Sequence, residues 1–122
     1  MFKIKIRKTD KLFSELVRNR DKWTCKRCGK KHEKGSRNCG VSHYWGRGRE
    51  STRFELDNCV VLCNIPCHQL WGHGDGRDQY KEFMIKRLGE KRFKTLELQA
   101  NCYQKKDDKL CLIWITEKLK EL

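Results

Sequence analysis

Two pairs of cysteines in the first half of the chain have the spacing of metal ligands. Two residues separate Cys25 from Cys28, and three separate Cys63 from Cys67. Four thiolates in two such pairs form a closed tetrahedral site, which is the usual arrangement for structural zinc. A redox-active dithiol is less well supported, because two charged residues lie between Cys25 and Cys28 and no βαβ pattern surrounds them. The sequence therefore predicts a structural zinc ion held by these four cysteines.

One histidine competes with these ligands. His32 follows Cys28 at a spacing that some zinc sites use, although Cys63 and Cys67 already complete a four-membered shell. The other cysteines have no partner at this spacing, and we expect them to be small buried residues: Cys39, Cys59, Cys102 and Cys111. The N-terminus lacks the continuous apolar stretch of a signal peptide, so eight cysteines favour metal ligation over disulfides. We therefore expect a cytoplasmic protein.

Positive charge is concentrated in the first part of the chain. The 122 residues carry a formal charge of +13, of which residues 1–50 contribute +11 and residues 51–122 contribute +2. A surface that served solubility alone would mix both signs, so this asymmetry indicates a polyanionic partner. Nucleic acid fits better than an anionic membrane, because the basic half contains no clear amphipathic helix. A run of about 18 apolar residues, which a membrane span would require, is absent from the sequence.

The apolar pattern predicts an α+β fold in a single domain covering residues 1–122. Residues 2–7 alternate between apolar and basic, as a strand would, and a helix capped by Thr9 or Asp10 follows and ends near Asp21. Across residues 40–72 we expect strand, loop, strand and helix, with Pro66 in the first turn of that helix.

The rest of the chain has helical periodicity. Apolar stripes in 80–88 and 93–103 are separated by Gly89, and a turn at 105–108 precedes a last amphipathic helix. We therefore expect a zinc-stapled core at 10–76 and a helical C-terminal extension at 77–122.

Three polar residues of the expected core stand in the order of a known nuclease motif. His43 ends the first expected strand, Asn58 precedes the second, and His68 follows the second cysteine pair. With the flanking cysteine pairs, this order resembles the HNH nucleases. Within that superfamily the chain is most similar to the NinG or Rap type of phage lambda recombination nuclease and to related phage HNH proteins. The residues that carry the likeness are 42–44, 46–48, 52–55, 57–58, 67–68 and 88–90.

The resemblance implies a ββα-metal (HNH, or His-Me finger) core with a flanking N-terminal helix and C-terminal helices. It also implies a metal-dependent DNA endonuclease, since in-line cleavage of a phosphodiester by water needs a base and a cation. His43 would be the general base, and Asn58 would offer its side-chain carbonyl to the second ring nitrogen of His43. His68 would hold a catalytic divalent cation, Mg²⁺ or Mn²⁺, with Ni²⁺ and Zn²⁺ as alternatives. The recombination resemblance also implies branched or single-stranded DNA as the preferred substrate, in a bacterial or phage-infected cell.

One position departs from the family pattern. The residue before the base is commonly Asp or His and contributes a metal ligand, whereas this chain has Ser42, a weak neutral oxygen donor. Ser42 itself, Asp57 or His73 could complete the metal shell. Because of this departure, a catalytically degenerate zinc-stapled module that only binds DNA is the alternative to an endonuclease.

Three arginines between the two expected strands are the predicted DNA contacts. Arg47, Arg49 and Arg53 lie in a loop where Gly46 and Gly48 allow the backbone to approach a phosphate. A guanidinium group can pair with phosphate through two parallel hydrogen bonds. Phosphate contacts carry no base information, so we expect low sequence specificity. Either a monomer or a homodimer is compatible with the sequence, because the last helix could be a dimer face or part of the core.

Overall fold

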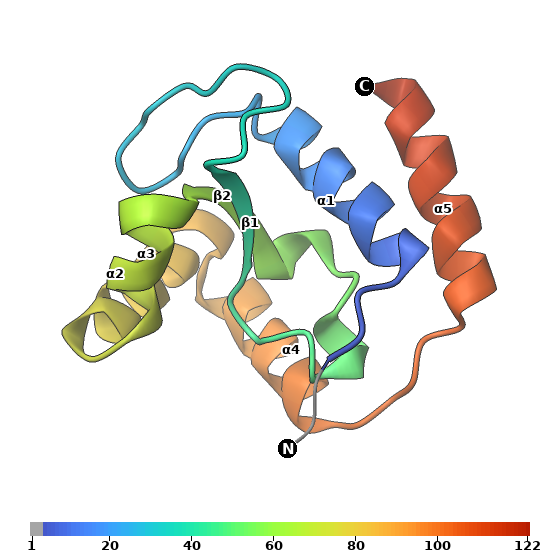
Figure 1. Cartoon of the computed structure of the whole chain (residues 1–122). Coiled ribbons are helices and arrows are strands. Elements are labelled where there is room, and N and C mark those ends of the chain that lie inside the picture. Colours follow the sequence, from blue (N-terminus) through green and yellow to red (C-terminus); the bar gives the residue numbers. More distant parts are fainter. Residues whose placement is uncertain (1–3) are drawn as a thin grey trace.

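The computed structural model describes residues 4–122, and within them it contains a two-stranded antiparallel sheet and five α-helices (Figure 1). Strand β1 (Cys39–His43) pairs with β2 (Cys59–Cys63), with Cys39 opposite Cys63 and His43 opposite Cys59. Short helical turns η1 (Glu50–Thr52) and η2 (Leu56–Asn58) join the strands, and η3 (Asn64–His68) leads from β2 into the helices. The helices are α1 (Lys8–Arg20), α2 (Gln69–Gly72), α3 (Asp75–Leu88), α4 (Glu90–Asn101) and α5 (Asp108–Glu121). The predicted α+β class is confirmed.

Both faces of the small sheet are covered by helices. All five residues of β2 are buried, and successive side chains of a strand point to opposite faces, so β2 contributes to two hydrophobic clusters. Val60 and Leu62 pack with side chains of α3 and α4, whereas Val61 packs with side chains of α1 and α5. Figure 1 shows α1 and α5 side by side on one flank of the sheet, with α2 and α3 on the other. The sheet is therefore packed on both faces, and it fixes the positions of the residues at the ends of β1 and β2.

The predicted caps of helix α1, Thr9 or Asp10, are wrong, because the N-cap is Arg7, two residues before Thr9. The Asp10 carboxylate accepts the backbone N–H of Arg7 at 2.8 Å, which makes Arg7 the capping position. Thr9 instead donates its hydroxyl to Asp108 of α5 at 3.0 Å. The helix ends at Arg20 with Asp21 as its C-cap, as predicted.

The strand predicted at residues 2–7 is wrong where the structure describes it. Residues 1–3 lie outside the described residues, and residues 4–7 pair with no strand. Ile4 and Ile6 are 47% and 46% exposed, and the carbonyl of Lys5 accepts a hydrogen bond from the Arg53 guanidinium at 2.8 Å. Alternation of apolar and basic residues was misleading here, because this segment is tied to a side chain instead of a sheet edge.

The C-terminal helices follow the predicted pattern. Gly89 separates α3 from α4 with a φ of 83°, a conformation that favours glycine, and the Asp107 carboxylate caps α5 by accepting the N–H of Leu110. Cys39 and Cys59 are buried as expected, whereas Cys102 is exposed and Cys111 is only half-buried. The helices found among residues 4–122 are all too short or too polar to span a bilayer.

Candidate functional site

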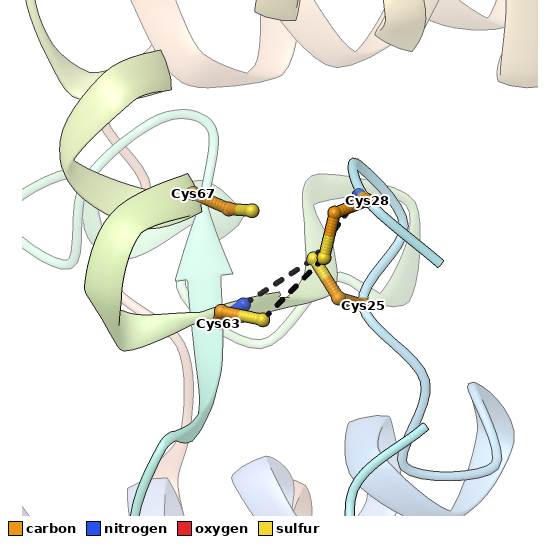
Figure 2. Close-up of side chains that lie close together, drawn as sticks. All are labelled: Cys25, Cys28, Cys63 and Cys67. Carbon is orange, nitrogen blue, oxygen red and sulfur yellow. Dashed lines mark hydrogen bonds between the residues drawn. The ribbon is translucent and has the colours of Figure 1, made fainter. Parts of the chain in front are cut away.

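The four predicted cysteines come together in one cluster. The sulfur atoms of Cys25, Cys28, Cys63 and Cys67 all lie within 4.8 Å of one another, and Figure 2 shows them converging from two segments of the chain. Sulfurs at the corners of a zinc tetrahedron with bonds of about 2.3 Å are about 3.8 Å apart. The Sγ atoms of Cys28 and Cys63 are 3.6 Å apart, close to that spacing. The cluster therefore fits a structural metal ion such as zinc, as the sequence predicts.

Local backbone geometry explains how the sulfurs are presented. A turn after Cys25, closed by Gly29 N–H donating to the Cys25 carbonyl at 2.9 Å, brings Cys28 back beside Cys25. Cys63 is the last residue of β2, and Cys67 lies in the turn η3 that follows. Burial opposes ionisation of Cys25, but backbone N–H groups of Cys28 and Cys63 outweigh it and lower its pKa to about 7. A thiol that ionises readily is suited to metal ligation.

His32 lies beside the cluster and contacts one of its sulfurs. Its Nε2 atom is 3.2 Å from Sγ of Cys63, and the ring is buried. Arg27 extends its guanidinium to within 3.5 Å of Sγ of Cys67. Both groups can donate N–H to a thiolate and so offset the negative charge of four sulfurs. In the structure His32 is placed to support a ligand, while the four cysteines form the shell.

His43 and His68 line the same surface pocket. This pocket has a volume of about 280 Å³, and its other lining residues are Ile4, Ile6, Val41, Gly46 and Arg47. His43 is the final residue of β1, whereas His68 directly follows Cys67 at the end of η3. The sheet therefore positions one histidine and the cysteine cluster positions the other. We call this space the His43 pocket.

The ring of His43 is oriented by a backbone carbonyl. Its Nε2 atom lies 3.2 Å from the carbonyl oxygen of Arg53. A carbonyl oxygen can only accept a hydrogen bond, so Nε2 carries the proton and Nδ1 is the unprotonated nitrogen. Burial, assisted by the positive charge of Arg47, lowers the pKa of His43 to about 4. His43 is therefore neutral near pH 7 and able to accept a proton at Nδ1.

Asn58 does not make the contact that the sequence led us to expect. Its side chain is fully buried, and its Oδ1 accepts the N–H of Trp45 at 2.9 Å. Its Nδ2 donates to the carbonyls of Trp45 at 2.9 Å and Thr52 at 3.1 Å. The expected bond to His43 is wrong because Asn58, one residue before β2, faces the backbone that follows β1. Asn58 holds the loop between the strands closed, and the Arg53 carbonyl orients the histidine.

The three candidates for completing a metal shell lie outside the His43 pocket. Ser42 is on the opposite face of β1 from His43, where its buried hydroxyl accepts the hydroxyl proton of Tyr80 at 2.8 Å. Asp57 forms an ion pair with Arg92 of α4. His73 is exposed at the end of α2. In this structure none of the three lines that pocket beside His68, where it could bind the same metal ion.

Comparison with known proteins gives one family. A family model described as bacteriophage lambda NinG protein matches residues 3–121. The chain belongs to the NinG family. This membership supports a role related to phage recombination. Neither the curated proteins nor the solved structures contain a significant match.

Two of the three arginines predicted to contact DNA serve other purposes in this NinG-family protein. Arg53 is 4% exposed, donates to both carboxylate oxygens of Asp10, and is enclosed by the protein. Arg49 stacks on the Trp45 ring at 5.2 Å and donates to the Ala100 carbonyl at 3.0 Å, which fastens the loop to α4. These two guanidinium groups connect the loop between the strands to α1, through Asp10, and to α4, through Ala100. Only Arg47 lines the His43 pocket.

Sequence reasoning missed several residues of the NinG-family site. Ile4 and Ile6 line the His43 pocket although they lie far from His43 in the chain, and the backbone carbonyl of Arg53 orients the ring. A backbone contact has no signature in the residue types. Two side chains that contact the sulfurs could have been found from the sequence, because Arg27 lies within the first cysteine pair and His32 follows it closely.

Proposed function

We propose that this NinG-family protein is a metal-dependent DNA endonuclease with a ββα-metal core of the HNH type. His43 would be its general base, and His68 would hold a divalent cation. The observation that carries the proposal is the position of the two histidines, which line one pocket at the end of a two-stranded sheet. The four-cysteine cluster supports it, because Cys67 fixes the backbone immediately before His68.

The residues of the pocket suit attack by water on a phosphodiester. Nδ1 of His43 would take the proton of a water molecule whose oxygen bonds to phosphorus, while the bond from phosphorus to the leaving oxygen breaks. Arg47 would contact the phosphate oxygens, and the negative phosphate would in turn raise the pKa of His43 and make it a stronger base. A divalent cation at His68 would neutralise charge on the phosphate and the leaving oxygen. As in the HNH nucleases that the chain resembles, we expect a 5′-phosphate and a 3′-hydroxyl.

A second candidate is a zinc-stapled DNA-binding module without catalysis. It is favoured by the composition of the His43 pocket, since its lining residues include no carboxylate beside the histidines. Ser42, at the position where relatives of the HNH type have a charged ligand, points to the other face of β1. A cation in the His43 pocket would have only imidazole nitrogen as a protein ligand, together with water and the phosphate of the substrate.

Plasmid nicking separates the two candidates. Wild-type protein, His43→Ala and the control His73→Ala would be incubated with supercoiled plasmid in Mg²⁺, Mn²⁺ and Ni²⁺, with a chelator control. We expect His43→Ala to reduce the nicking rate by about 100-fold or more, with zinc content and folding unchanged. His73→Ala should cut like the wild type, because His73 lies outside the pocket.

Two outcomes would contradict the proposal. Nicking by His43→Ala at the wild-type rate, in a preparation free of other nucleases, would remove the role given to His43. Binding of plasmid by the wild-type protein without nicking in every metal would establish the second candidate instead.

A further inference from the structure

The segment that carries the first cysteine pair is the most basic part of the chain. Residues 22–37, here called the basic loop, contain seven Lys or Arg and one Glu, a formal charge of +6. All seven basic residues are exposed: Lys22, Lys26, Arg27, Lys30, Lys31, Lys34 and Arg37. Almost half of the net charge of the protein therefore lies on 16 consecutive residues.

The charges of the basic loop are available to a ligand. In the described part of the chain, no salt bridge includes a residue of the loop, and Arg27 is its only basic side chain that donates a hydrogen bond, to Sγ of Cys67. The arginines around the His43 pocket differ in this respect. Arg53 and Arg47 face Asp10, and Arg49 binds the carbonyl of Ala100. Free cations are thus found on the loop, whereas the arginines that the sequence singled out are largely satisfied within the protein.

The cysteine cluster gives the basic loop its shape. The loop has no helix or strand, and its regular backbone pairing is one bridge between Thr24 and Lys31. Cys25 and Cys28 fix one side of it to β2, and Asn64 fixes the other side by donating to the Arg37 carbonyl at 2.8 Å. The cations are therefore presented on a defined surface when the metal site is formed.

The basic loop lies at one end of β1, and His43 lies at the other. Figure 1 shows the loop beyond the Cys39 end of β1, and His43 is the residue at the opposite end. A strand rises about 3.3 Å per residue, so the five residues of β1 span about 13 Å. Successive phosphates of one DNA strand are spaced about 3.4 Å apart along the helix axis. A DNA strand that ran parallel to β1 from the pocket would therefore have further phosphates near the loop after about four nucleotides.

We propose that the basic loop is a binding surface for the sugar-phosphate backbone of DNA, separate from the His43 pocket. The choice of DNA as the ligand rests on the proposed function, but binding by the loop does not require cleavage. An anionic membrane fits less well, because the loop exposes no large apolar side chain that could enter a bilayer. Lysine and arginine contacts to phosphate release counterions and make binding strongly dependent on salt.

The test compares two triple variants of equal charge. In the first, Lys30, Lys31 and Lys34 are replaced by Gln within the full-length, zinc-loaded protein. Binding to a fluorescent 30-base-pair duplex is measured without added divalent metal over a series of salt concentrations. We expect the slope of log affinity against log salt to become shallower by about 2 to 3, since each lost phosphate contact removes about 0.9. Zinc content and thermal unfolding report whether the loop is still folded.

The control variant removes the same charge elsewhere. Lys81, Lys86 and Lys94 are exposed residues of α3 and α4, and their replacement by Gln should change the slope by less than about 1. Equal changes in both variants would show that only total charge matters and would overturn the proposal.

Two further outcomes distinguish DNA binding by the loop from membrane binding and from the proposed endonuclease activity. Binding of vesicles of anionic lipid that is as tight as DNA binding and depends on the same three lysines would assign the loop to a membrane. Loss of DNA affinity in the loop variant, together with no nicking by the wild type, would leave the loop proposal standing and contradict the endonuclease.

Discussion

Arg53 and Asp10 form a buried ion pair that joins the loop after β1 to helix α1. The Arg53 Nη2 and Asp10 Oδ2 atoms are 2.6 Å apart, Nε and Oδ1 are 2.9 Å apart, and the two side chains are 4% and 1% exposed. The backbone carbonyl of the same arginine orients His43. One residue therefore connects the stability of the fold to the geometry of the candidate active site.

Breaking this ion pair should destabilise the protein strongly. Arg53→Met removes the two hydrogen bonds that a guanidinium donates to the buried Asp10 carboxylate and leaves Arg47, 3.6 Å away, as its remaining charge partner, which we expect to cost about 3 kcal/mol in the free energy of unfolding. Urea denaturation would measure it. Arg92→Gln is the matched control, because Arg92 pairs with Asp57 at the surface and should cost less than about 1 kcal/mol. A loss of similar size in both variants would contradict this account of Arg53.

The pH dependence of stability should reveal the buried histidine. His43 has a pKa of about 4 in the folded protein, lowered mainly by burial, against about 6.5 in the unfolded chain. Between those values the unfolded state binds more protons. The contribution of His43 therefore makes the free energy of unfolding fall as pH drops from 6.5 to 4, and it causes no further fall below 4.

Comparison with a variant that lacks His43 isolates that contribution. The difference in unfolding free energy between pH 7 and pH 4.5 should be smaller in His43→Gln than in the wild type, by at most about 3 kcal/mol. NMR titration of the His43 ring checks the pKa directly. A midpoint near 6.5 for this ring would refute the assignment.

Asn58 should matter for folding and not for the tautomer of His43. Asn58→Ala removes three hydrogen bonds and leaves backbone groups of Trp45 and Thr52 unsatisfied inside the protein. We expect a loss of about 2–4 kcal/mol in unfolding free energy, because each buried unsatisfied group costs about 1–3 kcal/mol. Nitrogen chemical shifts of the His43 ring should still report a proton on Nε2. A switch of that proton to Nδ1 would restore Asn58 as the residue that orients the base.

Metal binding should follow the four cysteines and leave His32 outside the shell. Purified protein should contain one zinc ion per chain, and its removal should unfold the region around Cys25 and Cys28, since structural zinc contributes directly to folding. Cobalt(II) in the same site should give the visible spectrum of four thiolate ligands.

Three variants test which side chains are ligands. His32→Gln should keep the four-thiolate cobalt spectrum but release metal faster to a chelator, because Nε2 of His32 contacts the Cys63 sulfur and is not counted among the four ligands. Cys28→Ser should change the spectrum, and Cys102→Ser, an exposed cysteine far from the cluster in sequence, should not. A changed spectrum in His32→Gln would make that histidine a ligand.

The sequence was most informative where spacing alone determines geometry. The cysteine pairs and the helix break at Gly89 were predictable, because knuckle spacing and glycine conformation act locally. The roles of Asn58 and Arg53 were not, because each depends on which distant backbone group happens to face the side chain. Residue type shows that an arginine can bind phosphate, and it does not show that Asp10, 43 residues away in the sequence, already holds it.

The pairing of α1 with α5 has a consequence for how the polypeptide is made. Phe13 and Val17 of α1 are covered on one side by Ile115 of α5, about one hundred residues later in the chain. During synthesis the nascent chain therefore exposes this apolar face of α1 until α5 emerges from the ribosomal exit tunnel. Such a late-closing contact slows folding and lengthens the time during which nascent chains can aggregate or recruit chaperones.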